Sequence, residues 1–262
     1  MLTGSESATA TGLDAIALKP TECAVERASD LPFETVAVDY EGREHLPDAE
    51  TLASLAEGHE VFLTTPVRAD GFDPLGDDSL TDWIPEGVRR VLVAGHPAYL
   101  SEAERSRAVA PRLGTAKERA TDAWVGTESV ERIALAAGGP QYELLSRSTT
   151  RDLRALRAAG LDADVVIYAP TVLTDDEDAV LDAVGDYSAR RKPVARALPD
   201  GAATDSEATG RARDVLLRAT RDYALVGTPE TVRERVAELK DAGATTVVGY
   251  PARGVDAFER RA

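Results

Sequence analysis

The chain has 262 residues and a formal net charge of −16, with 46 acidic and 30 basic side chains. An acidic surface repels nucleic acid and anionic membranes, so the charge argues against both as partners. No apolar run approaches the roughly 18 residues that a membrane-spanning helix needs. Cys23 is the only cysteine, which excludes a disulfide within the chain.

The composition also predicts the kind of organism from which the protein comes. Acidic residues outnumber basic ones, alanine is abundant, aromatic residues make up 5% of the chain and lysine is scarce. This combination is typical of proteins from a very salty cytosol, where ions screen the repulsion between like charges. We therefore expect a halophilic archaeon, with an ordinary acidic protein from a GC-rich genome as the alternative.

The first residues are rich in Ser, Thr and Ala and have neither a basic start nor an apolar stretch. They predict a disordered tail over residues 1–12 rather than a signal peptide, and hence a cytoplasmic protein. The remaining residues, 13–262, have the size of one α/β domain, and no internal repeat is visible.

Short apolar runs recur along the whole chain. Most are continuous stretches of Val, Ile, Leu and Ala, which is typical of parallel strands that are covered on both faces. We predict eight strands, at Asp14–Lys19, Thr35–Asp39, Val61–Thr65, Arg90–Ala94, Arg132–Ala137, Asp164–Ala169, Pro193–Leu198 and Thr245–Gly249.

Amphipathic patterns fill the intervals between these runs and predict helices. They lie at Thr21–Ser29, Pro47–Glu57, Ser101–Ala123, Thr149–Ala159 and Asp175–Arg191, with two more in the last segment. Eight strands with helical crossovers in a chain of this length indicate a single (β/α)8 TIM barrel. An open, doubly wound sheet is the alternative.

The last helix and strand have the clearest signals. Thr228 is suited to cap a helix, and Pro229 fits its first position, where the missing N–H has no partner. Valine and leucine recur at helical spacing until Gly243, a residue that readily takes the left-handed conformation at a helix end. The β-branched run Thr245–Val248 then predicts a buried strand.

Two ordered motifs carry a family resemblance. Gly227-Thr228-Pro229-Glu230 with the ending Gly249-Tyr250-Pro251 is similar to the C-terminal end of the bacterial luciferase-like superfamily. Upstream, Ile133–Pro140 resembles the family's turn with two glycines and a proline, and Asp164–Ile167 resembles its next strand. The matches cover roughly the second half of the chain. They imply a TIM barrel related to alkanesulfonate monooxygenases and methylenetetrahydromethanopterin reductases.

The resemblance implies a deazaflavin coenzyme or FMN at the carboxyl end of the barrel. Gly138 and Gly139 follow the predicted strand Arg132–Ala137, and glycines there let backbone N–H groups approach the cofactor phosphate. The alternative is a tight turn that needs glycine for its backbone conformation. Thr64 and Thr65 end the third predicted strand, where the family often has a strained peptide behind the flavin ring. The alternative is an ordinary trans turn in which a threonine hydroxyl bonds to the backbone.

Two further residues complete the predicted site. His96 follows the fourth predicted strand, which places an imidazole on the carboxyl rim for proton transfer, although a lone histidine is more often structural. Arg253 follows the last strand and can close over a phosphate or an anionic substrate, with a solvated surface role as the alternative. The three histidines are dispersed and no cysteine pair exists, so no metal site is predicted.

We therefore expect an oxidoreductase that acts on a small-molecule substrate, and the resemblance also suggests a homodimer. Family members usually carry a long insertion after the fourth strand, whereas residues 101–129 leave room for only a helix or two. Two alternatives follow. One is a reduced, non-catalytic barrel that serves as a binding or assembly protein, and the other is an enzyme for a phosphorylated metabolite without a redox cofactor.

Overall fold

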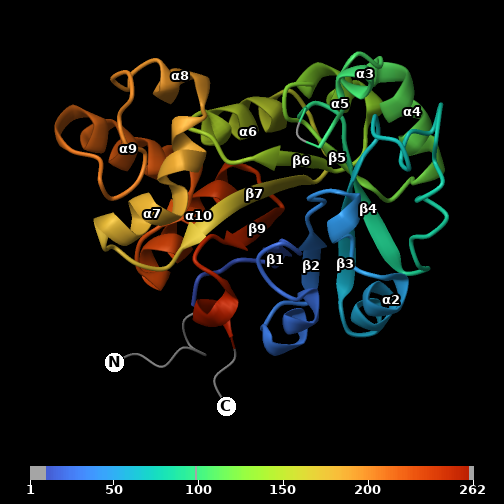
Figure 1. The fold of residues 1–262 in the computed structure, drawn as a ribbon, viewed down its shortest axis with the longest axis horizontal. Coiled ribbons are helices and arrows are strands. Elements are labelled where there is room, and N and C mark those ends of the chain that lie inside the picture. Colours follow the sequence, from blue (N-terminus) through green and yellow to red (C-terminus); the bar gives the residue numbers. More distant parts are fainter. Residues whose placement is uncertain (1–9, 98, 260–262) are drawn as a thin grey trace.

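A closed barrel of eight parallel strands forms the centre of the protein (Figure 1). The computed structural model describes residues 10–97 and 99–259. The hydrogen-bonded order is β1 to β7, then β9, which pairs back to β1. The strands are β1 (Ala15–Leu18), β2 (Thr35–Val38), β3 (Glu60–Pro66), β4 (Val88–Val93), β5 (Trp124–Gly126), β6 (Gln141–Leu144), β7 (Val165–Val172) and β9 (Thr246–Pro251). The predicted single (β/α)8 barrel is therefore confirmed.

A ninth short strand, β8 (Leu225–Val226), lies at the carboxyl end of the barrel. It pairs with Thr171 and Val172 at the end of β7, whereas β6 pairs with the first half of β7. Because β9 occupies the other edge of β7, β6 and β8 share one edge. The barrel wall thus widens between β6 and β7 at its carboxyl mouth.

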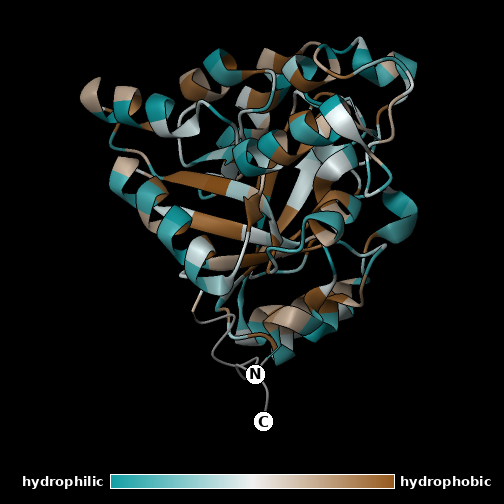
Figure 2. Ribbon diagram, turned by 90° about the vertical axis from the view of Figure 1, so that its left-hand side faces the viewer, coloured by the Kyte–Doolittle hydropathy of each residue, from teal (hydrophilic) through white to brown (hydrophobic). Residues whose placement is uncertain are grey.

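Helices cover the outside of the barrel, with their polar faces toward solvent and the apolar strands inside (Figure 2). They are η1 (Val25–Asp30), η2 (Arg43–His45), α2 (Ala49–Gly58), α3 (Glu102–Arg105), α4 (Val109–Arg119), α5 (Glu131–Ala137), α6 (Thr149–Ala158), α7 (Glu177–Ala189), α8 (Lys192–Ala195), α9 (Gly210–Tyr223), α10 (Pro229–Ala242) and η3 (Val255–Phe258). None of the helices in the described ranges has the length and apolar character to cross a membrane.

The predicted start and end of α10 are confirmed. Thr228 accepts a hydrogen bond from the Thr231 backbone N–H at 3.3 Å, and Pro229 occupies the first helical position. Gly243 ends the helix with a φ of 122°, a conformation that side chains with a Cβ rarely adopt. The buried face, Val232, Val236 and Leu239, packs against β7 and β9.

The barrel interior is divided into a small-residue side and an aromatic side. β1 and β2 contribute Ala15, Ala17 and Ala37, whereas β3, β5, β6 and β7 contribute aromatic rings. Phe62 and Trp124 stack with ring centres 3.6 Å apart, Trp124 also stacks on Tyr142, and Tyr142 meets Tyr168 at a tilt of 60°. Large rings opposite alanines fill the barrel centre.

Two of the predicted strands are wrong. Arg132–Ala137 lies in helix α5, and Pro193–Leu198 begins in helix α8. Both runs are alanine-rich, and alanine is the strongest helix former, so short apolar runs of this composition are ambiguous. The strands that complete the barrel are instead β5 and β6, which the sequence pattern did not predict. The predicted helix Ser101–Ala123 is also divided, into α3 and α4.

The predicted tail falls mostly outside the described residues, since description begins at Ala10. Thr11 is fully buried, and Gly12 lies against Arg233 and Val236 of α10. The described end of the predicted tail therefore packs on the barrel, contrary to the prediction for residues 10–12.

Helices α7, α8 and α9 form a projection between β7 and β8 (Figure 1). They share a small apolar cluster of their own, which includes Leu181, Leu216 and Tyr223. The link between α7 and α8 returns to the barrel, where Arg190 and Arg191 reach the carboxyl mouth.

Candidate active site

A cavity of about 310 Å³, here called the mouth cavity, lies at the carboxyl ends of the strands. Its walls come from β3, β4, β6 and β7, from the loops after β1, β2, β4 and β5, and from the end of α7 with the link that follows it. The lining residues are Lys19, Asp39, Tyr40, Glu41, Thr64, Pro66, Val93, His96, Tyr99, Glu128, Tyr142, Leu144, Tyr168, Tyr187, Arg190 and Arg191. Active sites of TIM barrels are built at this end, so the cavity is the candidate active site.

Asp39 is the central acidic group of the mouth cavity. It directly follows β2, and the Tyr168 hydroxyl on β7 donates a hydrogen bond to its Oδ2 at 2.8 Å. Burial raises the pKa of the Asp39 carboxyl to about 6, although the bond from Tyr168 and the charge of Lys19 lower it. A carboxyl with this pKa exchanges its proton near neutral pH, as a general acid or base must.

Tyr142 supplies a second polar group to the mouth cavity. Its side chain is only 6% exposed, and its hydroxyl has no hydrogen-bond partner among the described residues. Burial, with the nearby charge of Asp39, raises the pKa of the Tyr142 phenol well above its ordinary value, so it remains protonated. A buried hydroxyl without a partner costs free energy, which a bound ligand can recover by hydrogen bonding to it.

Cations lie on two sides of the mouth cavity. The Lys19 ammonium lies 3.8 Å from the centre of the Tyr250 ring. On the opposite side, Arg191 pairs with Glu128 at 3.4 Å and lies over the ring of Tyr187 at 4.2 Å. Because the same lining carries Asp39, Glu41 and Glu128, these cations offset local negative charge in a chain with a net charge of −16.

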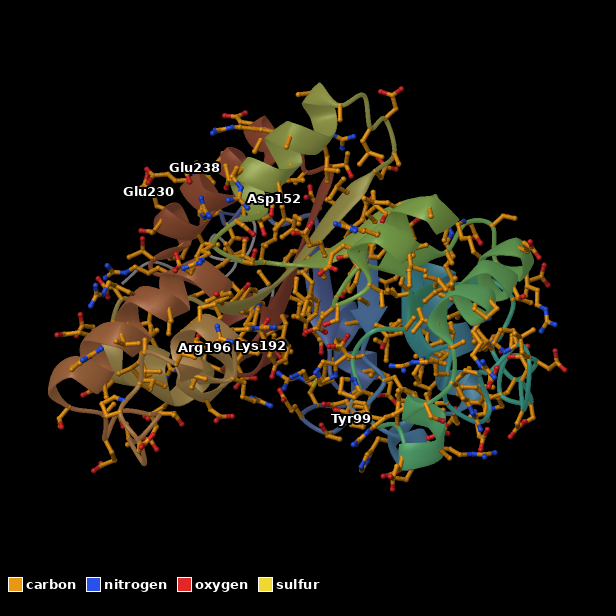
Figure 3. All side chains as sticks on the ribbon, turned by 90° about the horizontal axis from the view of Figure 1, so that it is seen from above. Tyr99, Asp152, Lys192, Arg196, Glu230 and Glu238 are labelled. Carbon is orange, nitrogen blue, oxygen red and sulfur yellow. The ribbon has the colours of Figure 1, made fainter. Side chains whose placement is uncertain are left out.

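The structure brings two of the predicted site residues together. His96 and Thr64 both line the mouth cavity, and His96 is exposed on the loop after β4, the loop that also carries Tyr99 (Figure 3). Thr64 accepts a hydrogen bond from the Tyr40 backbone N–H and donates one to the Val38 carbonyl at 3.3 Å. Thr64 therefore ties the ends of β2 and β3, and its binding role stays a prediction.

Two other predicted residues lie elsewhere. Thr65 is fully buried on the outer side of β3, where its hydroxyl donates to the Val91 carbonyl at 3.3 Å and accepts from Arg90. Successive residues of a strand face opposite sides, so Thr64 and Thr65 cannot both line the cavity. Arg253 is exposed after β9, outside the lining of the mouth cavity and within electrostatic reach of Asp182 on α7.

The predicted position of Gly138 and Gly139 is wrong. They follow helix α5 and precede β6, so they lie at the amino end of the barrel, opposite the mouth cavity. Gly138 ends α5 with a φ of 73°, and a Cβ on Gly139 would lie 2.5 Å from the Lys117 side chain. Turn geometry and close packing explain both glycines, as in the alternative interpretation of this motif.

The sequence did not single out Asp39 or Tyr142. Asp39 was the last residue of a predicted strand, and a polar residue at that position was the available signal. Within the described ranges, no group of three or more His, Cys, Asp or Glu side chains is arranged to hold a metal ion.

These features define a (β/α)8 TIM barrel with a candidate active site at the carboxyl ends of its strands. The structure of an F420-dependent secondary alcohol dehydrogenase, in complex with an F420-acetone adduct, aligns with a TM-score of 0.58 over 92% of this chain and 93% of that chain. The sequence identity is 12%, so this likeness concerns the fold. The chain itself belongs to DUF7388, a family of unknown function whose model matches residues 8–258.

Two other comparisons add nothing to the assignment. A protein assigned as a betaketoacyl-ACP reductase aligns at 15% identity over 92% of this chain and 96% of that one, with a TM-score of only 0.26. The search of curated proteins gives no match.

Proposed function

We propose that the protein is an oxidoreductase that binds a deazaflavin coenzyme in the mouth cavity and acts on a small organic substrate. The observation that carries this proposal is the Asp39–Tyr168 hydrogen bond beside the unpartnered hydroxyl of Tyr142. The luciferase-like fold and the F420 bound by the structural neighbour favour deazaflavin over FMN.

The residues of the mouth fit such a coenzyme. Tyr142 and Tyr168 offer aromatic surface for a flat ring, and the cavity volume of about 310 Å³ is within the usual range of ligand sites. Lys19 and Arg190 stand at the rim, where the anionic part of the coenzyme would extend. A bound deazaflavin supplies hydride transfer, and the protein supplies position and electrostatics.

The chain's own groups can manage the proton that accompanies hydride transfer. Asp39, with a pKa of about 6, can accept a proton at neutral pH, and the Tyr168 hydroxyl holds its carboxylate in place. The Tyr142 hydroxyl can donate a hydrogen bond to a substrate or coenzyme oxygen. Such positioning, together with proton transfer, accounts for rate gains of about 10²–10⁴ in other enzymes.

Fluorescence titration with deazaflavin coenzyme and with FMN, in molar salt, tests the proposal. We expect deazaflavin to bind more tightly than about 1 mM, and Tyr142→Phe to weaken binding roughly tenfold, the usual worth of one hydrogen bond. The same variant should keep its stability, because the lost hydroxyl has no hydrogen-bond partner in the described part of the chain. Glu234→Gln, at an exposed position on α10, is the control.

Three outcomes would contradict the proposal. If neither coenzyme binds below millimolar concentration, the oxidoreductase assignment fails and a non-catalytic barrel becomes the better description. Tight binding of inorganic phosphate or a sugar phosphate in place of either coenzyme would favour the enzyme without a redox cofactor. Equal binding by Tyr142→Phe and the unaltered protein would remove the mouth cavity as the coenzyme site.

A further inference from the structure

A second and larger cavity lies outside the barrel, over the outer face of β6. This side groove has a volume of about 870 Å³. Its walls are α5 and α6, and its far end is the α7–α8 link with Arg190, Arg191 and Lys192. Figure 3 shows Asp152 on α6 and Lys192 at the start of α8, one on each of these boundaries.

The floor of the side groove differs from the outer faces of the two neighbouring strands. The outward residues of neighbouring strands are aliphatic, such as Val125 on β5 and Ile167 on β7, and they pack against helices. At β6 the corresponding positions are Gln141 and Glu143. Both side chains face the groove, because residues two apart in a strand share a face at a spacing of about 6.5 Å.

Glu143 has no cationic partner among the residues that the structure describes. Its only hydrogen bond among the described residues comes from the Thr149 hydroxyl, at 3.4 Å. The nearby charges that act on it are also negative: Glu131 on α5 and Asp152 on α6. Burial and these two carboxylates raise the pKa of Glu143 to about 7. At higher pH the groove therefore holds an ionised carboxylate without a counter-charge.

Gln141, in the floor of the side groove, is a second and independent indication of a ligand site. The residue is 2% exposed, and its Nε2 donates to the carbonyls of Gly139 and Ala134 at 2.9 and 3.4 Å. These bonds orient the amide, and its Oε1 has no partner among the described residues. A buried acceptor beside an unpaired carboxylate requires a hydrogen-bond donor, and a positively charged donor satisfies both groups.

The apolar residues in the walls of the side groove indicate that the rest of the ligand is apolar. Leu135, which is 40% exposed, and Leu156 face the groove with Ala155 and Ala159. From this arrangement we propose that the side groove binds a small organic cation with an apolar body, such as a primary alkylamine, with its ammonium on Glu143 and Gln141. Arg190, Arg191 and Lys192 at the far end disfavour a second positive charge, so a monoamine suits the groove better than a polyamine.

Isothermal titration with n-hexylamine, n-hexanol and hexanoate tests this site. At pH 8 we expect hexylamine to bind most tightly, and Glu143→Gln to weaken its binding roughly tenfold to a hundredfold, as for a charged hydrogen bond. Binding should fall about tenfold from pH 8 to pH 6, because Glu143 gains a proton while the amine stays charged. Glu234→Gln should bind like the unaltered chain.

Several results would overturn the proposal. They are equal binding of hexylamine and hexanol, tighter binding of hexanoate, unchanged hexylamine binding in Glu143→Gln, or no hexylamine binding below about 10 mM. Glu143→Gln removes a buried charge and keeps the side-chain shape, so its thermal unfolding should stay cooperative and a loss of binding can be read directly. The cavities share Arg190 and Arg191 at their edges, but Glu143 lines only the side groove and Tyr142 only the mouth cavity, so Glu143→Gln and Tyr142→Phe distinguish the two tests.

Discussion

Replacing Asp39 with asparagine should stabilise the protein at pH 8 and sharply lower the activity that we propose for the mouth cavity. The Asp39 carboxyl has its pKa raised from 3.8 to about 6, so the folded chain binds its proton more tightly than the unfolded chain does. Ionised Asp39 therefore costs stability, and this cost develops as the pH rises from about 4 to about 6. The amide of an asparagine side chain carries no charge to desolvate, and its oxygen can still accept the Tyr168 hydrogen bond.

We expect Asp39→Asn to raise the free energy of unfolding at pH 8 by about 2 kcal/mol. This is less than the ~3 kcal/mol that a shift of two pKa units gives for a group with no access to solvent. Near pH 4 the gain should almost vanish. Urea unfolding at both pH values measures it, with Asp214→Asn, an exposed position on α9, as the control. A loss of stability at pH 8, or an equal gain at both pH values, would contradict the assignment of Asp39 as a desolvated carboxyl.

The activity of the same variant separates function from structure. If the protein is a deazaflavin-dependent oxidoreductase, Asp39→Asn should lower kcat by roughly 10²–10⁴, the usual contribution of a general acid or base. Coenzyme affinity should change much less, because Tyr142 and the aromatic rings remain. If Asp39 is a desolvated catalytic carboxyl, we expect the variant to be more stable and to bind coenzyme, but not to turn over substrate.

The fold was predictable from the sequence because most of its strands are covered on both faces, by helices outside the barrel and by the barrel core inside. Strands such as β3 and β7 are buried on both faces, so their sequences are continuous apolar runs. The prediction of eight strands was nevertheless right in number partly by compensation, since α5 and α8 were counted as strands and β5 and β6 were not.

β6 was missed for a physical reason. Its sequence alternates Gln141, Tyr142, Glu143 and Leu144, because the inner face meets the barrel core while the outer face meets the side groove. Such alternation is typical of a strand with one solvated face, whereas parallel barrel strands are usually apolar on both. The departure from the expected pattern therefore marks the place where a helix does not cover the barrel.

The candidate site was predictable only in part. His96 and Thr64 follow from the rule that strand ends meet at one mouth of a barrel. The hydrogen bond between Asp39 and Tyr168 joins residues 129 positions apart, and no local pattern contains it. Likewise, two adjacent glycines look the same in sequence at either end of a strand, and only the true position of β6 shows which end Gly138 and Gly139 occupy.

Gly95→Ala should cause the largest loss of stability among single substitutions near the mouth cavity. A Cβ at Gly95 would lie 1.7 Å from the Glu128 backbone carbonyl oxygen and 3.3 Å from the Val130 side chain. The Gly95 carbonyl also accepts a hydrogen bond from Arg68, at 3.3 Å. The loops after β4 and β5 are thus in backbone contact, and a backbone atom cannot move aside as a flexible side chain can.

We expect Gly95→Ala to lower the free energy of unfolding by about 3 kcal/mol or more, at the upper end for overpacking. Gly114→Ala is the matched control, because it is the same substitution in α4, where a Cβ meets no atom within 4 Å. It should instead stabilise the chain by about 0.5–1 kcal/mol, the difference between alanine and glycine inside a helix. Chemical unfolding of both variants measures these values.

The consequence for the mouth cavity follows from the same contact. Glu128 and His96 both line the cavity, and the close approach at Gly95 fixes the distance between their loops. If Gly95→Ala folds at low temperature, its coenzyme binding should be weaker than that of Gly114→Ala under the same conditions. Equal stability of the two variants would show that the loops after β4 and β5 are not in contact, and the mouth cavity would then lack one of its walls.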